Sequence, residues 1–437
     1  MKHIDRQILQ IALPSIVSNI TVPLLGLIDV AIVGHLGSPA YIGAIAVGGM
    51  LFNIIYWIFG FLRMGTSGMT SQAYGKRDLP EIVRLLMRSV GIGLAVALCL
   101  ILLQVPIRQA AFLIIHPTAE VREMATLYFH ICIWGVPAML GLYGLSGWFI
   151  GMQNSRIPMY IAITQNIVNI IASLSFVCFF KMKVEGVAFG TLIAQYAGFI
   201  MGLVLWMSRY GKLKKYILWK GVLQKEAMMR FFQVNRDIFL RTLCLVTVTL
   251  FFTSAGASQG EIILAVNTLL MQLFTLFSYV MDGFAYAGEA LSGRYIGARN
   301  RKAFTNTTRH LFIWGGWLAA FFTLVYALGG NAFLGLLTDN KDVVSAAGTY
   351  FYWALAIPVA GIAAFIWDGI FIGATATRGM LASMAIAAIS FFVVYYGLRP
   401  VLGNHALWLA FLVYLAMRGV VQTLLSPKII KENFTQP

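Results

Sequence analysis

Long apolar segments separated by short polar gaps run through the whole 437-residue chain. A helix crosses a bilayer with about 20 mostly apolar residues, and twelve of these segments reach that length. The pattern predicts an all-α integral membrane protein with twelve transmembrane helices. We expect the spans at 8–33, 41–64, 84–106, 127–150, 158–180, 186–207, 233–256, 261–288, 309–329, 347–372, 379–397 and 403–425.

An internal repeat divides these spans into two sets of six. A shift of 222 residues superposes Tyr128-Phe129 on Tyr350-Phe351, Gly147 on Gly369, and QAYGKRD on RYIGARN. Because six is an even number, both halves enter the membrane from the same side, as in a parallel repeat. We therefore expect two six-helix lobes around a central cleft, an arrangement typical of transporters that open alternately to either side. The expected bounds are 1–207 and 233–425 for the lobes, 208–232 for a basic linker and 426–437 for a tail.

Composition and charge support a membrane protein and indicate its orientation. The chain is 59% hydrophobic and 11% charged, whereas soluble domains have about 25% charged residues. With the N-terminus inside, 25 of the 32 Lys and Arg residues fall on the inner side and six on the outer. This count includes Arg241 as the end of the basic linker. The distribution predicts cytoplasmic termini in the inner membrane and excludes a folded nucleic-acid-binding face.

The first span carries Pro14, Pro23 and the carboxylate of Asp29. Prolines free backbone carbonyls and bend membrane helices. A carboxylate within a span costs about 2.5–3.5 kcal/mol to insert, so it usually faces protein or water. Two interpretations of Asp29 remain: it reaches the headgroup region, or it is a titratable group beside a cavity.

Polar faces on the fifth and sixth spans are further candidates. Asn166, Asn169 and Ser173 share one face of the fifth span, and Thr191 and Gln195 lie one turn apart on the sixth. Such residues often only join helices, at about 0.6 kcal/mol per contact. The alternative is that they line a site.

Several segments resemble the multidrug and toxic compound extrusion (MATE) family, and in the second half its DinF branch. They are ALP near the start, LIDVAIVGHLG, MTSQAYGKRD, DGFAYAGEALSGRYIGARN and WDGIFIGATATR. The resemblance covers the whole chain. It implies two six-helix lobes and the export of amphipathic, often cationic, compounds in exchange for protons or sodium ions.

The resemblance also implies a cation site in the first lobe. Asp29, Asn169 and Thr191 match three of its residues, and Pro14 matches a proline proposed to bend the first helix. Ser173 stands where the family has a second aspartate. A sodium ion prefers several oxygen ligands with carboxylate charge, whereas a proton needs only one carboxylate. The substitution therefore favours proton coupling.

Acidic residues in the second half are coupling candidates too. Asp282 and Glu289 lie on one helix face about 10.5 Å apart along the axis, and Asp368 lies in the middle of the tenth span. Each either titrates during transport or pairs with basic and polar side chains. For Glu289 the pairing partner would be Arg294 or Arg63.

Methionine and aromatic side chains suit a cavity that accepts many apolar shapes. Packing between helices and against lipid also explains most of them. The substrate-cleft candidates are Trp57, Met64, Met139, Tyr143, Trp148, Asn166, Gln195 and Glu289.

The sequence thus predicts a proton- or sodium-driven efflux antiporter that acts as a monomer without a cofactor or metal. The alternative is a lipid-linked saccharide flippase, which would need intramembrane arginines; only Arg63 and Arg418 lie near a span interior. An intramembrane enzyme is not expected, because His130 is the only deep histidine and has no catalytic motif around it. A channel is not expected either, since no segment resembles a filter loop.

Overall fold

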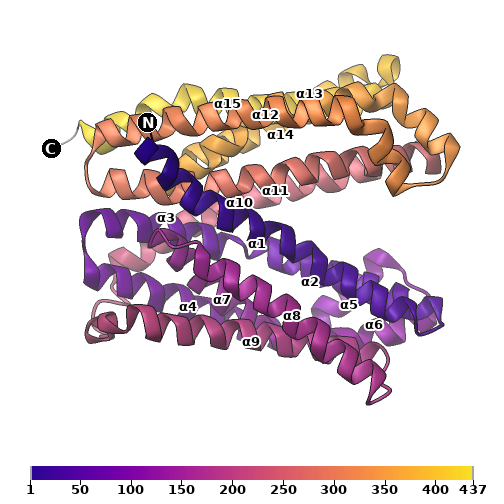
Figure 1. The fold of residues 1–437 in the computed structure, drawn as a ribbon, viewed down its shortest axis with the longest axis horizontal. Helices are drawn as coiled ribbons and strands as arrows, with labels where there is room; N and C mark the ends of the chain where they lie inside the picture. Colours follow the sequence, from indigo (N-terminus) through magenta and orange to yellow (C-terminus); the bar gives the residue numbers. More distant parts are fainter. Residues whose placement is uncertain (1, 436–437) are drawn as a thin grey trace. The chain divides into compact units, whose positions relative to one another are not determined.

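The structure, a computed structural model, describes residues 2–435, and every regular element within that range is a helix. Twelve segments are long and apolar enough to cross a membrane, which confirms the predicted all-α class. The first six are α1 (Lys2–Gly34), α2 with α3 (Pro39–Ile58 and Phe61–Lys76), α4 (Leu79–Leu102), α6 with α7 (Ala119–Cys132 and Val136–Gly151), α8 (Arg156–Cys178) and α9 (Val184–Tyr210). The last six are α10 (Lys225–Ala257), α11 (Glu261–Gly297), α12 (Arg301–Leu337), α13 (Lys341–Gly373), α14 (Thr377–Leu402) and α15 (Asn404–Phe434) (Figure 1).

Several helices are interrupted or extended relative to the predicted spans. The second span breaks at Phe59–Gly60, and a short 3-10 helix, η1 (Ile133–Gly135), interrupts the fourth. A further short helix, α5 (Gln104–Ile115), follows the third span and was not predicted. Apolar windows mark only the part of a helix that matches the bilayer, so they do not show where its polar ends stop.

The predicted linker and tail are largely helical. α9 continues into a 3-10 helix, η2 (Gly211–Tyr216), and α10 already begins at Lys225, which leaves only residues 217–224 without regular helix. The predicted tail likewise continues α15 as far as Phe434.

By their contacts the described residues form two compact units. One is Val17–Phe231, and the other combines residues 2–16 with 232–435. These bounds differ from the predicted lobes, because residues 2–16 group with the second half and linker residues 208–231 group with the first. Both unit boundaries fall inside continuous helices, α1 and α10.

Polar contacts hold the beginning of α1 in the second unit. The Asp5 carboxylate lies 2.9 Å from His310 Nδ1 and accepts a hydrogen bond from Trp314 Nε1 at 3.2 Å. Tyr295 donates its hydroxyl to Gln7 Oε1 at 2.6 Å. The start of α1 is therefore fixed to α11 and α12.

The buried guanidinium of Arg88 holds the irregular linker segment in the first unit. It donates to the carbonyls of Val222 (2.8 Å) and Gly221 (2.9 Å) and pairs with Glu81 (2.7 Å). One α4 side chain thus fixes the path of the segment that connects the two halves.

The internal repeat is confirmed by matching backbone geometry in the two units. A Cβ atom on Gly147 would lie 2.3 Å from the carbonyl oxygen of Arg63, and one on Gly369 would lie 2.2 Å from that of Ala285. The shift of 222 residues relates both members of the first pair to the second pair. Each unit therefore brings its most buried span against a neighbouring helix at the same point.

Helix ends repeat in the same way. Arg77 and Arg299 follow the ends of α3 and α11, and both have left-handed backbones, at φ 59° and 52°. In the next position, Asp78 and Asn300 both cap the following helix through a side-chain oxygen. The same 222-residue shift relates each pair, so the repeat includes local conformation as well as helix order.

Candidate functional site

Asp29 points inward from a half-helix whose other side chains, apart from buried Val33, are exposed or half-buried. Its side chain belongs to the C-terminal part of α1, within the unit Val17–Phe231. Asp29 is 5% exposed, whereas Leu27 and Val30 on the same stretch are 64% and 38% exposed. The first helix therefore buries a carboxylate among its own unit's helices.

Asp29 receives hydrogen bonds from two helices. Asn169 Nδ2 of α8 donates to its Oδ1 at 3.0 Å, and Thr191 Oγ1 of α9 lies 3.2 Å from its Oδ2. Ser173 donates to Asn169 Oδ1 at 3.3 Å. The structure thus brings together the four residues to which the sequence assigned cation or proton coupling in the first half.

Small residues on α9 allow α8 to approach closely enough to build this cluster. A Cβ atom on Gly190 would lie 2.1 Å from Ser173 Oγ, and one on Gly198 would lie 2.4 Å from Gln165 Nε2. Small residues spaced four apart form a smooth stripe along which membrane helices pack. The local sequence of α9 therefore positions Thr191 beside Asn169.

The electrostatic setting of Asp29 is a single negative charge among neutral groups. Its hydrogen-bond partners among the described residues are the amide of Asn169 and the hydroxyl of Thr191. Burying an unpaired carboxylate is costly unless a proton or cation neutralises it. The cluster can therefore hold one positive charge.

Other polar candidates of the first half join helices nearby. Asn166 Nδ2 donates to the backbone carbonyls of Thr21 (3.2 Å) and Ala162 (3.0 Å), so this residue connects α8 to α1. Gln195 Nε2 donates to the Tyr56 hydroxyl at 3.4 Å.

Three of the apolar cleft candidates in the first unit are Met64, Met139 and Tyr143. The Tyr143 ring stands edge-on to that of Tyr56, with ring centroids 6.4 Å apart. Met139 Sδ lies 4.0 Å from Gln165 Nε2, and Met64 is half-buried on α3. These positions are compatible with side chains that line an interior site, a role that stays a prediction.

The two prolines of α1 do not interrupt it. The helix is continuous from Lys2 to Gly34 through Pro14 and Pro23. The boundary between the two units, at Ile16 and Val17, lies between these prolines.

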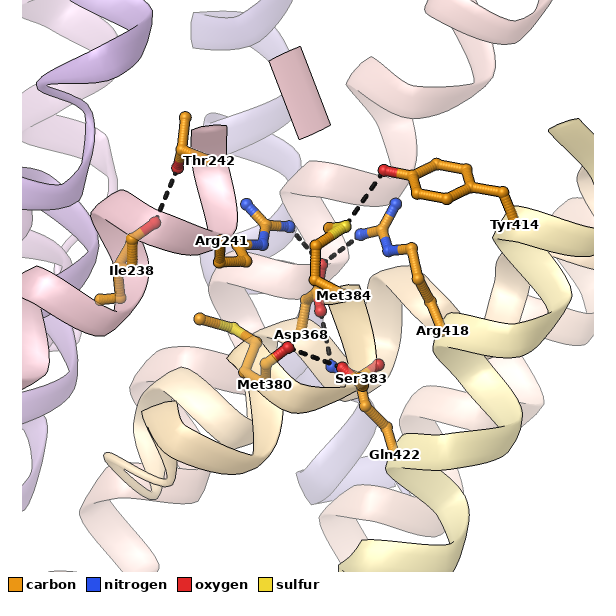
Figure 2. Close-up of polar contacts among 10 residues, drawn as sticks. All are labelled: Ile238, Arg241, Thr242, Asp368, Met380, Ser383, Met384, Tyr414, Arg418 and Gln422. Atoms are coloured by element: carbon orange, nitrogen blue, oxygen red, sulfur yellow. Dashed lines mark hydrogen bonds and ion pairs between the residues drawn. The ribbon is translucent and has the colours of Figure 1, made fainter. Parts of the chain in front are cut away.

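In the second unit, Asp368 of α13 lies between two arginines (Figure 2). Arg241 of α10 donates to Asp368 Oδ2 at 2.5 Å, and Arg418 of α15 donates to the same oxygen. Gln422 Nε2, one turn beyond Arg418, donates to Oδ1 at 2.6 Å. Of the two interpretations of Asp368, the observed contacts are those of pairing with basic and polar side chains.

Arg241 does not belong to the basic linker, contrary to the prediction. The Lys and Arg count included it in the linker. In the structure it is 7% exposed and lies well inside α10. The sequence did contain evidence of a buried position, because the span expected at 233–256 includes this arginine. An arginine flanked by apolar residues inside a span indicates an interior partner.

The other two acids lie on α11. Glu289 is 1% exposed and Asp282 is half-buried. The hydrogen-bond partners of Asp368 come from α10 and α15 and not from α11. The second-half acids therefore do not form one shared carboxylate cluster around Asp368.

The Asp29 cluster has no polar counterpart in the second unit. The 222-residue shift relates Asp29, Asn169 and Ser173 to three aromatic residues: Phe251, Phe391 and Tyr395. These rings contact one another, with centroid separations of 5.9 Å for Phe251–Phe391 and 5.3 Å for Phe251–Tyr395. The same place in the fold is thus polar in one half and aromatic in the other.

The charged residues of the Asp368 cluster likewise have no charged counterparts in the first unit. The same shift relates Asp368 to Ser146 and Arg241 to Asn19, neither of which is charged. The two units share a backbone plan but differ in the chemistry of their interiors.

Comparison with known families supports the repeat. The model of the family described as MatE matches the chain twice, over residues 14–174 and 238–398. Each match covers one half, as expected for two homologous sets of helices.

Among curated proteins, DNA damage-inducible protein F of Escherichia coli is 39% identical over 420 residues, covering 95% of this chain and 90% of that protein. Protein DETOXIFICATION 44, chloroplastic, of Arabidopsis thaliana is 24% identical over 95% of this chain and 81% of its own length. The similarity therefore extends over nearly the full chain in both cases.

Solved structures show the same fold. A crystal structure of MATE in the bent conformation matches with a TM-score of 0.90 at 18% identity, covering 99% of this chain and 97% of that one. The Vibrio cholerae MATE transporter VcmN in the bent form matches with a TM-score of 0.87 at 17% identity, over 99% and 98%. The chain is a multi-pass membrane protein that belongs to the MatE family, whose members are transporters and not enzymes.

Proposed function

We propose that the protein is an efflux antiporter that exports amphipathic or cationic small molecules in exchange for protons entering the cell. One relative, from Synechococcus, is named a probable multidrug resistance protein, NorM. The positive-inside distribution of Lys and Arg supports cytoplasmic termini in the inner membrane. The antiporter would act as a monomer and need no cofactor besides the coupling ion.

The observation that carries this proposal is the buried carboxylate of Asp29 with only neutral partners. A site of this kind changes its charge by one when it takes up or releases a cation. An exchanger needs such a group, because the substrate and the coupling ion must favour different states of the protein.

The orientation of the neighbouring groups favours a proton over a sodium ion. Asn169 presents its amide nitrogen to Asp29, while its oxygen accepts from Ser173. A sodium ion would need several oxygens directed at one point, and the serine supplies no second carboxylate. A proton needs only one oxygen of Asp29.

The test is drug efflux from cells or inverted vesicles under separately imposed proton and sodium gradients. We expect a proton gradient alone to drive efflux, and Asp29→Asn to abolish it. Asp339→Asn, in the exposed loop before α13, removes the same charge and should leave efflux unchanged.

Efflux driven only by sodium, with Asp29→Asn fully active, would contradict both the coupling ion and the site. The flippase alternative is separated by a lipid-translocation assay in proteoliposomes. Translocation of a lipid-linked saccharide without efflux of any amphipathic cation would replace the proposal.

A further inference from the structure

We propose that Arg241, Arg418 and Gln422 form a binding site for the anionic group, such as a carboxylate or sulfonate, of a transported molecule. Asp368 occupies this site as an internal substitute while no ligand is bound. The inference rests on the proposed export function, since it assigns a chemical class to part of the substrate range. It predicts that zwitterionic and acidic amphiphiles are recognised in the second unit.

The geometry is that of an anion site. Two guanidinium groups from different helices converge on one carboxylate oxygen, and an amide donates to the other (Figure 2). Arginine binds carboxylates through a planar array of N–H donors, and it holds its charge under all ordinary conditions. All four side chains are more than nine-tenths buried.

The cluster has more binding capacity than Asp368 uses. The side chains in mutual contact carry two positive charges and one negative charge. The Nε atoms of Arg241 and Arg418 and the Oε1 atom of Gln422 are buried without a hydrogen-bond partner. Buried polar atoms in native proteins normally have partners. The two Nε–H donors could therefore bind a further anionic oxygen, whereas Gln422 Oε1 is an acceptor and would not contribute.

Among the described residues, Asp368 is the acid that pairs with these arginines. Asp237, one turn before Arg241 on α10, accepts from Thr377 Oγ1 at 3.0 Å and pairs with exposed Arg236. Within the described part of the chain, the carboxylate that contacts the two arginines is that of Asp368. The Arg418 guanidinium also lies over the rings of Phe365 and Tyr414.

A ligand carboxylate would therefore compete with Asp368 for the two arginines. The competition limits affinity and allows release, which a transporter requires. A cationic substrate without an acidic group gains nothing from this site, so the two substrate classes should respond differently to its removal.

Two dyes that differ in one group make the test specific. Rhodamine 110 has a free carboxylate, and rhodamine 123 is its methyl ester with the same cationic ring system. Binding of each dye to the purified full-length protein is measured by fluorescence polarisation. We expect the wild type to bind rhodamine 110 about tenfold more tightly than rhodamine 123, as for loss of a charge-assisted hydrogen bond.

Variants then separate binding from structure. Arg418→Gln should abolish the preference for rhodamine 110, and Asp368→Asn should increase it because the internal competitor is removed. The double variant Arg418→Gln/Asp368→Asn leaves Arg241 without its carboxylate partner and should restore part of the preference. Arg236→Gln removes the same charge as Arg418→Gln but at an exposed position of α10, and it should have no effect.

Equal affinities of the wild type for the two dyes would overturn the proposal. So would equal losses for both dyes in Arg418→Gln together with a lowered melting temperature, because that result indicates a purely structural ion pair. Binding needs no ion gradient, so failure of the proposed antiport would leave this measurement valid.

Discussion

At the residue scale, Asn169 connects the acidic group of the first unit to its neighbours. Its amide nitrogen donates to Asp29, and its oxygen accepts from Ser173. The side chain is completely buried. It therefore orients the cluster in addition to occupying it.

Replacing Asn169 with alanine should weaken both stability and transport. The change leaves one oxygen of Asp29 without its buried donor, which typically costs about 1–3 kcal/mol. Ser173→Ala removes a hydrogen bond that does not involve Asp29 and should have a smaller effect on both properties. Melting curves of the purified variants and efflux assays in cells would measure this order, and a more damaging Ser173→Ala would contradict it.

How far single residues can be predicted from sequence is illustrated by Asn169 and Arg241. Asn169 belongs to a set of polar residues at helical spacing, so periodicity predicts the helix face on which it lies. The arginine was obscured by the basic run before it, because α10 begins earlier than the apolar window suggests. The contacts of Arg241 with Asp368 depend on how α10 packs against α13, and periodicity does not specify that packing.

At the element scale, α7 and α13 are held in place by close contact between their backbones and that of a neighbouring helix. α13 reaches α11 where a Cβ on Gly369 would lie 2.2 Å from a carbonyl oxygen. Rigid backbone cannot move aside as a flexible side chain can. Position 369 therefore requires glycine, because there is no space for a Cβ atom.

Gly369→Ala should therefore destabilise the protein by about 1–3 kcal/mol, the usual cost of overpacking. Gly316→Ala, in the middle of α12, meets nothing within 4 Å and should be neutral or slightly stabilising. Thermal unfolding of the two purified variants would measure the difference. Equal melting temperatures would show that α13 and α11 do not pack as described.

Helix lengths were less predictable than helix number. The sequence shows which segments match the bilayer, but capping residues such as Asp78 and Asn300 determine where helices begin outside it. The linker is a similar case. Its short irregular part is held by Arg88, a residue of α4 that lies more than a hundred positions away in sequence.

At the scale of the whole molecule, the order of spans predicts which loops share a side. Three spans, α10 to α12, separate the linker from the loop at residues 338–340. These two segments must therefore lie on opposite faces of the membrane. The Lys and Arg distribution places the linker inside.

A cysteine at Lys220 should react with a membrane-impermeant maleimide only in inverted vesicles, and one at Asp339 only in intact cells. The background would replace the four native cysteines: Cys99, Cys132, Cys178 and Cys244. Drug efflux by the cysteine-free protein is the control for its folding. Labelling of both positions from the same side would contradict the twelve-span order.

The division of α1 and α10 between the units affects where chimeric proteins can be joined. The N-terminal part of each of these helices belongs to the other unit. Residues 2–16 of α1 group with the second half, and Lys225–Phe231 of α10 group with the first. A half-gene ending in the linker thus encodes neither unit completely, since it separates Asp5 from His310 and Trp314. Chimeras between homologues should keep native packing when their breakpoints fall at 16/17 and 231/232. The two units therefore cannot be exchanged as uninterrupted halves of the sequence.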